Sequence, residues 1–324
     1  MSSLNYFVLS SAGKPIFTRY PSSTTILTSA SLTALLSFSE DSKVNLKSLI
    51  MEDGETMVVM RKGGIVLGAK GNATSGFTSV VCEFVYSQIV STLTLKVQSI
   101  FRKSSKFDLR SMLTSTDSTI HGLLDKSDDY SDLMLCAVAA VNMDGKVRRE
   151  CDRVLVEAAS KTDGTVFAVV VSEGKLVSVV QPKSPELRIP SSDLLLLSNF
   201  TKVQKQTLMK NESWFPLCLP GFNAQGFLYC YCYCLHEAAG MFLCLISNVN
   251  TPEQFHNFQI CRVAVSSALG MDGGGGEGDG KPEDGKAGGG GELVGKVLDS
   301  MEDTERKIVE RYSGYAGVLH FAYR

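Results

Sequence analysis

The fold of this chain is indicated by the stretch YFVLSSAGKPIFTRY, which runs from Tyr6 to Tyr20. It contains two runs rich in β-branched and aromatic residues, Tyr6 to Ser10 and Pro15 to Tyr20, and the four residues between them favour a turn. Gly13 is one of these four and can adopt a positive φ angle without a steric penalty. The stretch therefore predicts a β-hairpin at the start of a domain that combines strands and helices.

The residues after the hairpin continue this domain. A helix is expected from Thr25 to Phe38, and a long helix from Phe77 to Arg102, where apolar residues recur every three or four positions. A shorter helix is expected near Phe107 to Leu113. Three strand-like runs separate the first two helices: Val44 to Met51, Glu55 to Arg61 and Ile65 to Ala69. The expected order is β-β-α-β-β-β-α-α.

The second half of the chain repeats the core of this order. A helix is expected from Cys151 to Ser160, followed by a second hairpin that turns at Glu173-Gly174. The later elements are a helix from Pro190 to Phe200 and strands at Trp214 to Leu219, Phe227 to Leu235 and Met241 to Ser247. A last helix is expected to run to Leu269, with Thr251 as its N-terminal cap and Pro252 in its first position. The shared order β-β-α-β-β-β-α is that of a longin domain. The sequence therefore predicts an α+β protein of tandem longin-type domains, each a five-stranded antiparallel sheet flanked by helices on both faces.

The predicted domain boundaries follow changes in composition. Residues 1–114 form the first longin domain and residues 133–270 the second, with an Asp- and Ser-containing linker at 115–132. Residues 271–291 are rich in glycine and poor in apolar residues, which is typical of a flexible loop. Residues 292–324 are expected to begin a third longin domain that is truncated within its first strand.

The composition is that of a folded, soluble protein. The formal net charge is -2, so the whole chain has no general attraction for nucleic acid. The nine cysteines are an odd number and lie mostly in apolar segments, which indicates reduced, buried thiols and a cytoplasmic protein. The N-terminus shows no secretory signal, and the longest apolar run, Phe227 to Leu235, is shorter than the roughly 18 residues that a membrane-spanning helix needs.

No motif in the sequence indicates covalent chemistry. The four histidines lie far apart, outside metal-binding and nucleophile motifs. One face of a predicted strand carries Cys230, Cys232, Cys234 and His236. This face could hold zinc or pack beneath a helix, and packing is favoured because the thiols are spread along an extended strand. Residues 275–281 match a phosphate-binding loop by spacing, but Pro282 replaces the Ser or Thr that would contact Mg²⁺. We therefore expect no metal, no cofactor and no catalytic residue.

The helix expected from Thr25 to Phe38 has two apolar stripes. The first is expected to cover the sheet and consists of Leu27, Ala30, Ala34 and Phe38. The second lies on nearly the opposite side and consists of Leu32 and Leu36 beside Thr25 and Ser29. Because a surface helix needs only one such stripe, we expect the second to be either buried under the second domain or a docking surface for a partner.

A cluster of basic residues lies at the end of the long helix and just beyond it. These residues are Lys96, Arg102, Lys103, Lys106 and Arg110. They either compensate the helix dipole and stay solvated, or they contact anionic lipid headgroups, which attract each nearby basic residue by about 1 kcal/mol.

Three segments resemble one known family. Residues Phe7 to Tyr20 are similar to the opening signature of the SAND family, the vacuolar fusion proteins called Mon-one. Phe107 to Arg110 resembles the family's motif after the long helix, and Glu212 to Asn223 resembles its most distinctive stretch. The matches occur in order across both predicted domains, so the resemblance spans roughly Tyr6 to Leu269. Val318 to Arg324 is similar to the first strand of the family's third longin domain.

The resemblance implies a role in vesicle traffic. Such proteins pair with a Ccz-family longin subunit to form a guanine nucleotide exchange factor for a late-endosomal or vacuolar Rab GTPase of the Rab seven class. This activity serves membrane fusion, endosome maturation, autophagy and protein transport. The resemblance further implies a cytoplasmic protein that is recruited peripherally to late endosome, vacuole or lysosome membranes, with an anionic phosphoinositide surface as a candidate partner.

The resemblance also implies roles for two surfaces. In the family, the first longin domains join through their sheet edges, and their first helices face the GTPase. The partner edge corresponds here to Val44, Leu46, Ser48 and Ile50, and the Rab-facing residues correspond to Thr25, Ser29, Leu32 and Leu36. Exchange needs no nucleophile, because a thousandfold faster release of GDP requires only about 4 kcal/mol of preferential binding to the opened GTPase.

We therefore expect Leu32 and Leu36 to hold a displaced switch segment of the Rab. The alternatives are a longin adaptor or scaffold that binds a partner without accelerating exchange, and a truncated, inactive isoform.

Overall fold

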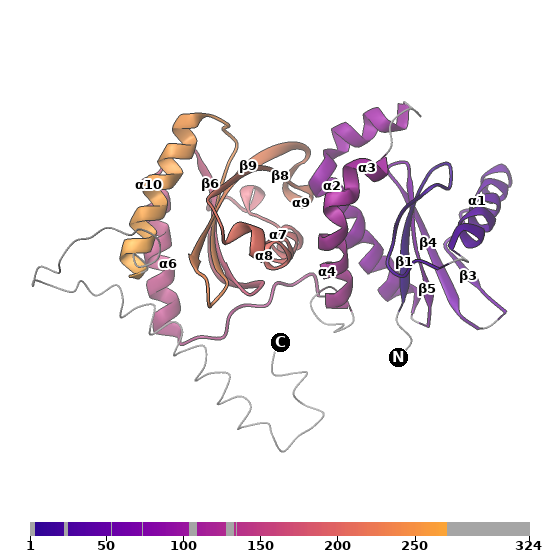
Figure 1. Ribbon diagram of the computed structural model, residues 1–324, viewed down its shortest axis with the longest axis horizontal. Coiled ribbons are helices and arrows are strands. Elements are labelled where there is room, and N and C mark those ends of the chain that lie inside the picture. The colour runs from indigo at the N-terminus through magenta and orange to yellow at the C-terminus, as the bar shows by residue number, and fades with distance from the viewer. Residues whose placement is uncertain are drawn as a thin grey trace, which may run out of the picture. The chain divides into compact units, whose positions relative to one another are not determined.

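The computed structural model describes residues 4–270, apart from 23–24, 53, 73, 104–108, 128–132 and 134. Within this part the chain forms two compact units, which Figure 1 shows. The first unit contains the residues up to Ala137 together with Ser191–Leu196 and Cys218–Phe227, and the second contains the remaining described residues. The predicted Gly-rich loop at 271–291 and the predicted third domain at 292–324 lie outside the described residues.

The first unit contains a five-stranded antiparallel sheet. Its strands lie in the spatial order β2-β1-β5-β4-β3 and are β1 (Asn5–Ser10), β2 (Pro15–Thr18), β3 (Ser48–Ile50), β4 (Thr56–Lys62) and β5 (Ile65–Gly71). The predicted hairpin is confirmed: β1 pairs with β2, and Gly13 has a φ angle of 79°. The N–H of Gly13 donates a hydrogen bond to the carbonyl oxygen of Ser10 at 2.9 Å, which closes the turn.

Helices cover both faces of this sheet. Helix α1 (Thr25–Asp41) packs on one face. Helix α2 (Ser75–Lys103) packs against β4 and β5 on the other face, and the short helix α3 (Leu109–Leu113) follows it. Gly68 on β5 leaves room for the ring of Phe7, because a Cβ atom at this glycine would come within 2.6 Å of the ring. The order predicted for the first longin domain is therefore confirmed.

The described part of the segment at 115–132 is helical, where a linker was expected. It belongs to a 3₁₀ turn, η1 (Thr114–Thr116), and to helix α4 (Asp117–Ser127), which contacts α2. Ile120, Leu123 and Leu124 are buried on one side of α4. The prediction was wrong because it relied on the high overall content of Asp and Ser. Overall composition does not reveal that a helix has a polar face in solvent and an apolar face in the core.

Helix α2 is interrupted at Thr94, whose φ and ψ angles are 58° and 157°. Such angles are strained for a β-branched residue. The buried hydroxyl of Thr94 accepts a hydrogen bond from the N–H of Val97 at 3.3 Å and so caps the last part of the helix. Among the described helices, α2 alone is long and apolar enough to cross a membrane, but 61% of that window is buried, as in the core helix of a folded domain.

The second sheet repeats the topology of the first. Its strands lie in the order β7-β6-β10-β9-β8 and are β6 (Thr165–Ser172), β7 (Lys175–Val180), β8 (Ser213–Leu219), β9 (Ala224–His236) and β10 (Met241–Ser247). This order corresponds strand for strand to that of the first sheet. The described part of the chain therefore contains two longin-type domains of one topology, in agreement with the tandem longin-type fold predicted from the sequence.

The described helices of the second half are α6 (Gly145–Ser160), α7 (Ser191–Val203), α8 (Lys205–Leu208), α9 (Pro220–Asn223) and α10 (Pro252–Leu269), with a 3₁₀ turn, η2 (Pro185–Leu187). Helices α6 and α10 lie side by side on one face of the second sheet, where both contribute to its core (Figure 1). Thr251 caps α10 as expected, because its hydroxyl accepts a hydrogen bond from the N–H of Gln254 at 3.2 Å.

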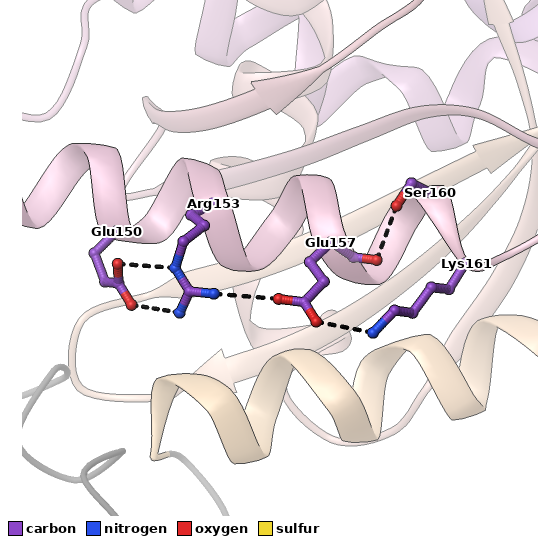
Figure 2. Close-up of polar contacts among 5 residues, drawn as sticks. All are labelled: Glu150, Arg153, Glu157, Ser160 and Lys161. Carbon is purple, nitrogen blue, oxygen red and sulfur yellow. Dashed lines mark hydrogen bonds and ion pairs between the residues drawn. The ribbon is translucent and has the colours of Figure 1, made fainter.

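The solvent-facing side of α6 carries a row of ion pairs, which Figure 2 shows. The guanidinium of Arg153 donates to Glu150 at 2.6 Å and to Glu157 at 3.2 Å, and the ammonium of Lys161 donates to Glu157 at 2.8 Å. These side chains are three and four positions apart and therefore lie next to one another on the helix. The row stabilises the helix surface and leaves the opposite face of α6 for the core.

Candidate partner-binding surface on the first unit

Helix α1 faces the sheet with its second stripe, which was expected either to lie under the second domain or to face a partner. Leu32 and Leu36 are only 1% and 4% exposed, and they pack against Phe7, Leu9, Met57, Val59 and Val66. Ser29 is buried as well. The prediction that Ser29, Leu32 and Leu36 contact a Rab is therefore wrong, and the side chain of Thr25 lies outside the described residues.

The reason lies in side-chain size at the middle of the helix. Both stripes have helical spacing, so periodicity alone cannot choose between them. Where α1 crosses the sheet, one stripe offers two leucines and the other offers Ala30 and Ala34. Burying the leucines removes more apolar surface from water, at about 25 cal/mol per Å², and this decides the orientation.

The outward side of α1 carries its own apolar residues. Phe38 is 71% exposed and Leu35 is 45% exposed. Together with the exposed Ala30 and Ala34, they form what we call the exposed α1 stripe. Large apolar side chains that stay in water on one helix face are typical of a protein-binding surface.

Strand β3 is an open edge of the first sheet. The N–H of Val59 donates to the carbonyl oxygen of Lys47, and the N–H of Met51 donates to that of Glu55, both at 2.9 Å. Because backbone groups alternate in direction along an antiparallel strand, those of Ser48 and Ile50 point away from β4. The side chain of Ile50 is 83% exposed.

The predicted partner edge is thus shorter than expected. Ser48 and Ile50 belong to β3, whereas Val44 and Leu46 precede it. Val44 is exposed, but Leu46 is half-buried and packs against the core beneath α1. Of the four predicted edge residues, Ser48 and Ile50 are the two placed for pairing with another strand.

The other sheet edges are less suited to pairing. Strand β2 has four residues and begins with Pro15. Strand β7 is already covered, because Leu176 exchanges backbone hydrogen bonds of 2.8 Å with Ala139 and Val141. Strand β8 contains Pro216, which has no N–H to donate. Among the edges of the two described sheets, β3 is therefore the most open, and α1 lies over this side of its sheet (Figure 1).

The predicted basic cluster lies only partly within the described residues. The side chains of Lys96 and Arg110 are exposed. Those of Arg102 and Lys103, and the whole of Lys106, lie outside the described residues. Lipid contact by this cluster stays a prediction.

The cysteine cluster of the second sheet consists of free thiols. Cys230, Cys232 and Cys244 are buried, and the Sγ atoms of Cys232 and Cys244 lie 3.8 Å apart. Hydrogen bonding to Cys244 and burial hold the pKa of Cys230 and Cys232 well above the usual value. No cluster of His, Cys, Asp and Glu within the described residues is arranged to hold a metal ion. The arrangement favours packing over zinc binding.

The segment from Glu212 to Asn223 is held by a carboxylate that sequence reasoning missed. Asp193, in the first turn of α7, accepts hydrogen bonds from the N–H groups of Gly221 at 2.9 Å and Phe222 at 2.8 Å in the short helix α9 (Pro220–Asn223). Burial raises the pKa of Asp193, and the two hydrogen bonds oppose that shift. In the sequence, Asp193 is an ordinary first-turn residue, so no local signal marks this long-range contact.

Two family models match most of the described chain. Residues 4–123 match the first longin domain of FUZ, MON1 and HPS1, and residues 163–267 match the second longin domain of the same proteins. Each matched range contains one of the two five-stranded sheets.

Similar curated proteins have related names. The chain is 33% identical over 260 residues to Protein SAND of Takifugu rubripes, and this alignment covers 79% of the chain and 48% of that protein. It is 32% identical over 270 residues to the mouse (Mus musculus) Vacuolar fusion protein MON1 homolog B, covering 81% of the chain and 47% of the relative. It is 33% identical over 245 residues to Vacuolar fusion protein MON1 of Yarrowia lipolytica, covering 73% of the chain and 44% of that relative. The chain thus spans about half the length of the curated relatives it matches.

Proposed function

The chain belongs to the SAND/MON1 family of longin-domain proteins, and on that basis we propose that it is a subunit of a guanine nucleotide exchange factor acting in vacuolar fusion. Its partner is a Ccz-family longin subunit, and its target is a late-endosomal or vacuolar Rab GTPase of the Rab seven class. It works as a trafficking regulator, recruited from the cytoplasm to the surface of late endosomes or vacuoles.

The observation that carries this proposal is the pairing of an open strand edge with an apolar helix on one longin sheet. Strand β3 offers the outward backbone groups of Ser48 and Ile50 for pairing with a second longin sheet. The exposed α1 stripe then offers Leu35 and Phe38 to the GTPase. One surface joins the subunits and the other contacts the Rab.

The available apolar surface is of the right size for the task. A thousandfold faster release of GDP requires about 4 kcal/mol of preferential binding to the opened GTPase. Complete burial of a leucine or phenylalanine side chain contributes about 1.5–3 kcal/mol. Leu35 and Phe38 can therefore supply much of this difference if they contact a segment that is exposed only after the GTPase opens.

The test is GDP release from the Rab in the presence of the complex with the Ccz-family subunit. We expect Leu35→Asp/Phe38→Asp to slow exchange at least tenfold, because carboxylates replace the apolar contact, while the complex still assembles through β3. The matched control is Ile260→Asp, which changes an exposed apolar residue on α10 and should leave exchange unchanged.

Unchanged exchange by the double variant, with the complex intact, would show that the exposed α1 stripe is not the Rab-contacting surface. Assembly with the partner but no exchange by the unmodified chain would instead identify a non-catalytic adaptor or an inactive isoform.

A further inference from the structure

A hollow of about 380 Å³ lies in the first unit, between α1 and one end of the first sheet. Its walls are the C-terminal half of α1, the turn that follows β1, and the turn that joins β4 to β5. Thr33 and Ser37 line it. Leu35 is two residues away from each of them, so at 100° per residue it lies about 160° around the helix axis. The hollow is therefore on the side of α1 opposite Leu35.

The hollow has an apolar floor and a polar rim. Leu36 and Val66, both buried, form part of the floor. Hydroxyl groups from Ser10 and Ser37 lie among the rim residues, together with the guanidinium of Arg61. A ligand that fits this arrangement presents an aliphatic group next to a hydrogen-bond acceptor.

The charged lining is positive overall. Arg61 and Lys62 are opposed by one carboxylate, that of Glu40. Lys62 is held to one side, because its ammonium pairs with Glu83 at 2.5 Å and lies 4.8 Å from the centre of the Tyr86 ring. Arg61 is the cation placed to meet a ligand.

The ion pair between Arg61 and Glu40 is easily exchanged. Its side chains are 30% and 68% exposed, and an exposed pair contributes only about 0–1 kcal/mol. An incoming carboxylate can therefore replace Glu40 at little cost. The planar guanidinium fork suits a carboxylate, which it can bind through two parallel hydrogen bonds.

We infer that this hollow binds an acidic peptide segment of a protein partner, with an aliphatic side chain on the Leu36 and Val66 floor and a neighbouring carboxylate on Arg61. The volume is near the lower end of the roughly 300–1,000 Å³ of small-molecule sites, which is room for one or two side chains. This contact uses neither Leu35 nor Phe38 and does not depend on nucleotide exchange.

The test uses the full chain and two fluorescent octapeptides of glycine and serine, each with one central leucine. One peptide has glutamates on both sides of the leucine, and the other has glutamines. We expect fluorescence anisotropy at low salt to show binding of the glutamate peptide and at least tenfold weaker binding of the glutamine peptide. Arg61→Glu should weaken binding of the glutamate peptide at least tenfold. Arg61→Gln should also weaken it.

Glu40→Gln gives a test that loss of folding cannot imitate. It removes the competing carboxylate, so we expect two- to fivefold tighter binding, which corresponds to about 0.4–1 kcal/mol and lies within the range for an exposed pair. Arg153→Glu is the matched control, because it makes the same charge change at an arginine in the exposed ion pairs of α6 (Figure 2) and should leave the affinity unchanged. The melting temperature of each variant confirms that it is folded.

Three results would overturn the inference. They are equal binding of the two peptides, binding that is insensitive to Arg61, and the absence of peptide binding. In the last case, Arg61-dependent binding to phosphatidylserine vesicles would assign the hollow to a membrane surface instead.

Discussion

Two leucines one position apart on α1 have opposite surroundings. Leu36 belongs to the core beneath the helix, whereas Leu35 remains 45% exposed on the outside. The two side chains are chemically identical, so their different environments separate the stability of the first unit from the partner contact proposed for its surface. This separation is the basis for assigning Leu35 and Phe38, in place of Leu32 and Leu36, to the proposed Rab contact.

The same pair gives a direct test of the orientation of α1. We expect Leu36→Ala to lower the free energy of unfolding by about 2–5 kcal/mol, because it leaves a cavity in the core. Leu35→Ala, the matched control, should change it by no more than about 0.5 kcal/mol, as is usual at the surface. Urea unfolding followed by circular dichroism measures both, and an equal loss in the two variants would mean that the helix is rotated.

Among the described elements, β3 is the one best suited to pair with a strand of another protein. It is three residues long, contains no proline, and directs two sets of backbone groups away from its own sheet. Such an edge is prone to pair with another chain unless it is protected. The equivalent strand of the second sheet, β8, carries Pro216, so the two longin domains differ at the same topological position.

A proline can therefore block β3 selectively. Ile50→Pro removes an N–H that points outward, so the sheet keeps its own hydrogen bonds while pairing with a second sheet is lost. We expect this variant to stay folded and to bind the Ccz-family subunit at least tenfold more weakly in a pull-down titration. Leu49→Pro removes an inward N–H and should instead destabilise the sheet. Full partner binding by a folded Ile50→Pro variant would rule out the β3 edge as the subunit interface.

At the level of the whole molecule, the two units are not successive pieces of the chain. Ser191–Leu196 and Cys218–Phe227 come from the second longin sequence but belong to the first unit. One contact within that unit is the hydrogen bond from the hydroxyl of Ser91 on α2 to the carbonyl oxygen of Cys218, at 2.7 Å. The first longin sequence alone therefore lacks part of its own packing.

Hydrogen exchange tests this dependence. In a fragment of residues 1–137 we expect the amides of α2 near Ser91 to exchange faster than in the full chain, because the segment at 218–227 no longer covers them. Amides in the ladder between β1 and β5 serve as the internal control and should change less, since all their partners remain in the fragment. Equal protection of α2 in both proteins would show that the first longin sequence is self-sufficient.

The sequence by itself determined the order of the elements in both domains, both hairpins, the cap of α10 and the lack of a recognisable catalytic motif. These features depend on residues close together in the chain: Gly13 in a turn, Thr251 before Pro252, and apolar residues at strand or helix spacing. The family resemblance came from similarly local segments. Local patterns of this kind can be recognised without knowing which residues distant in sequence lie nearby in the structure.

Only the tertiary structure decided which stripe of α1 is buried, that α4 lies where a linker was expected, and that Asp193 holds α9. Each depends on a partner distant in sequence: Leu36 on Val66, α4 on α2, and Asp193 on Gly221. Two stripes of equal spacing have the same periodicity, and the surface that each one meets in three dimensions determines which is more stable when buried. For this reason the sequence pointed to α1 as the helix proposed to bind a partner, and the tertiary structure showed which of its faces is exposed.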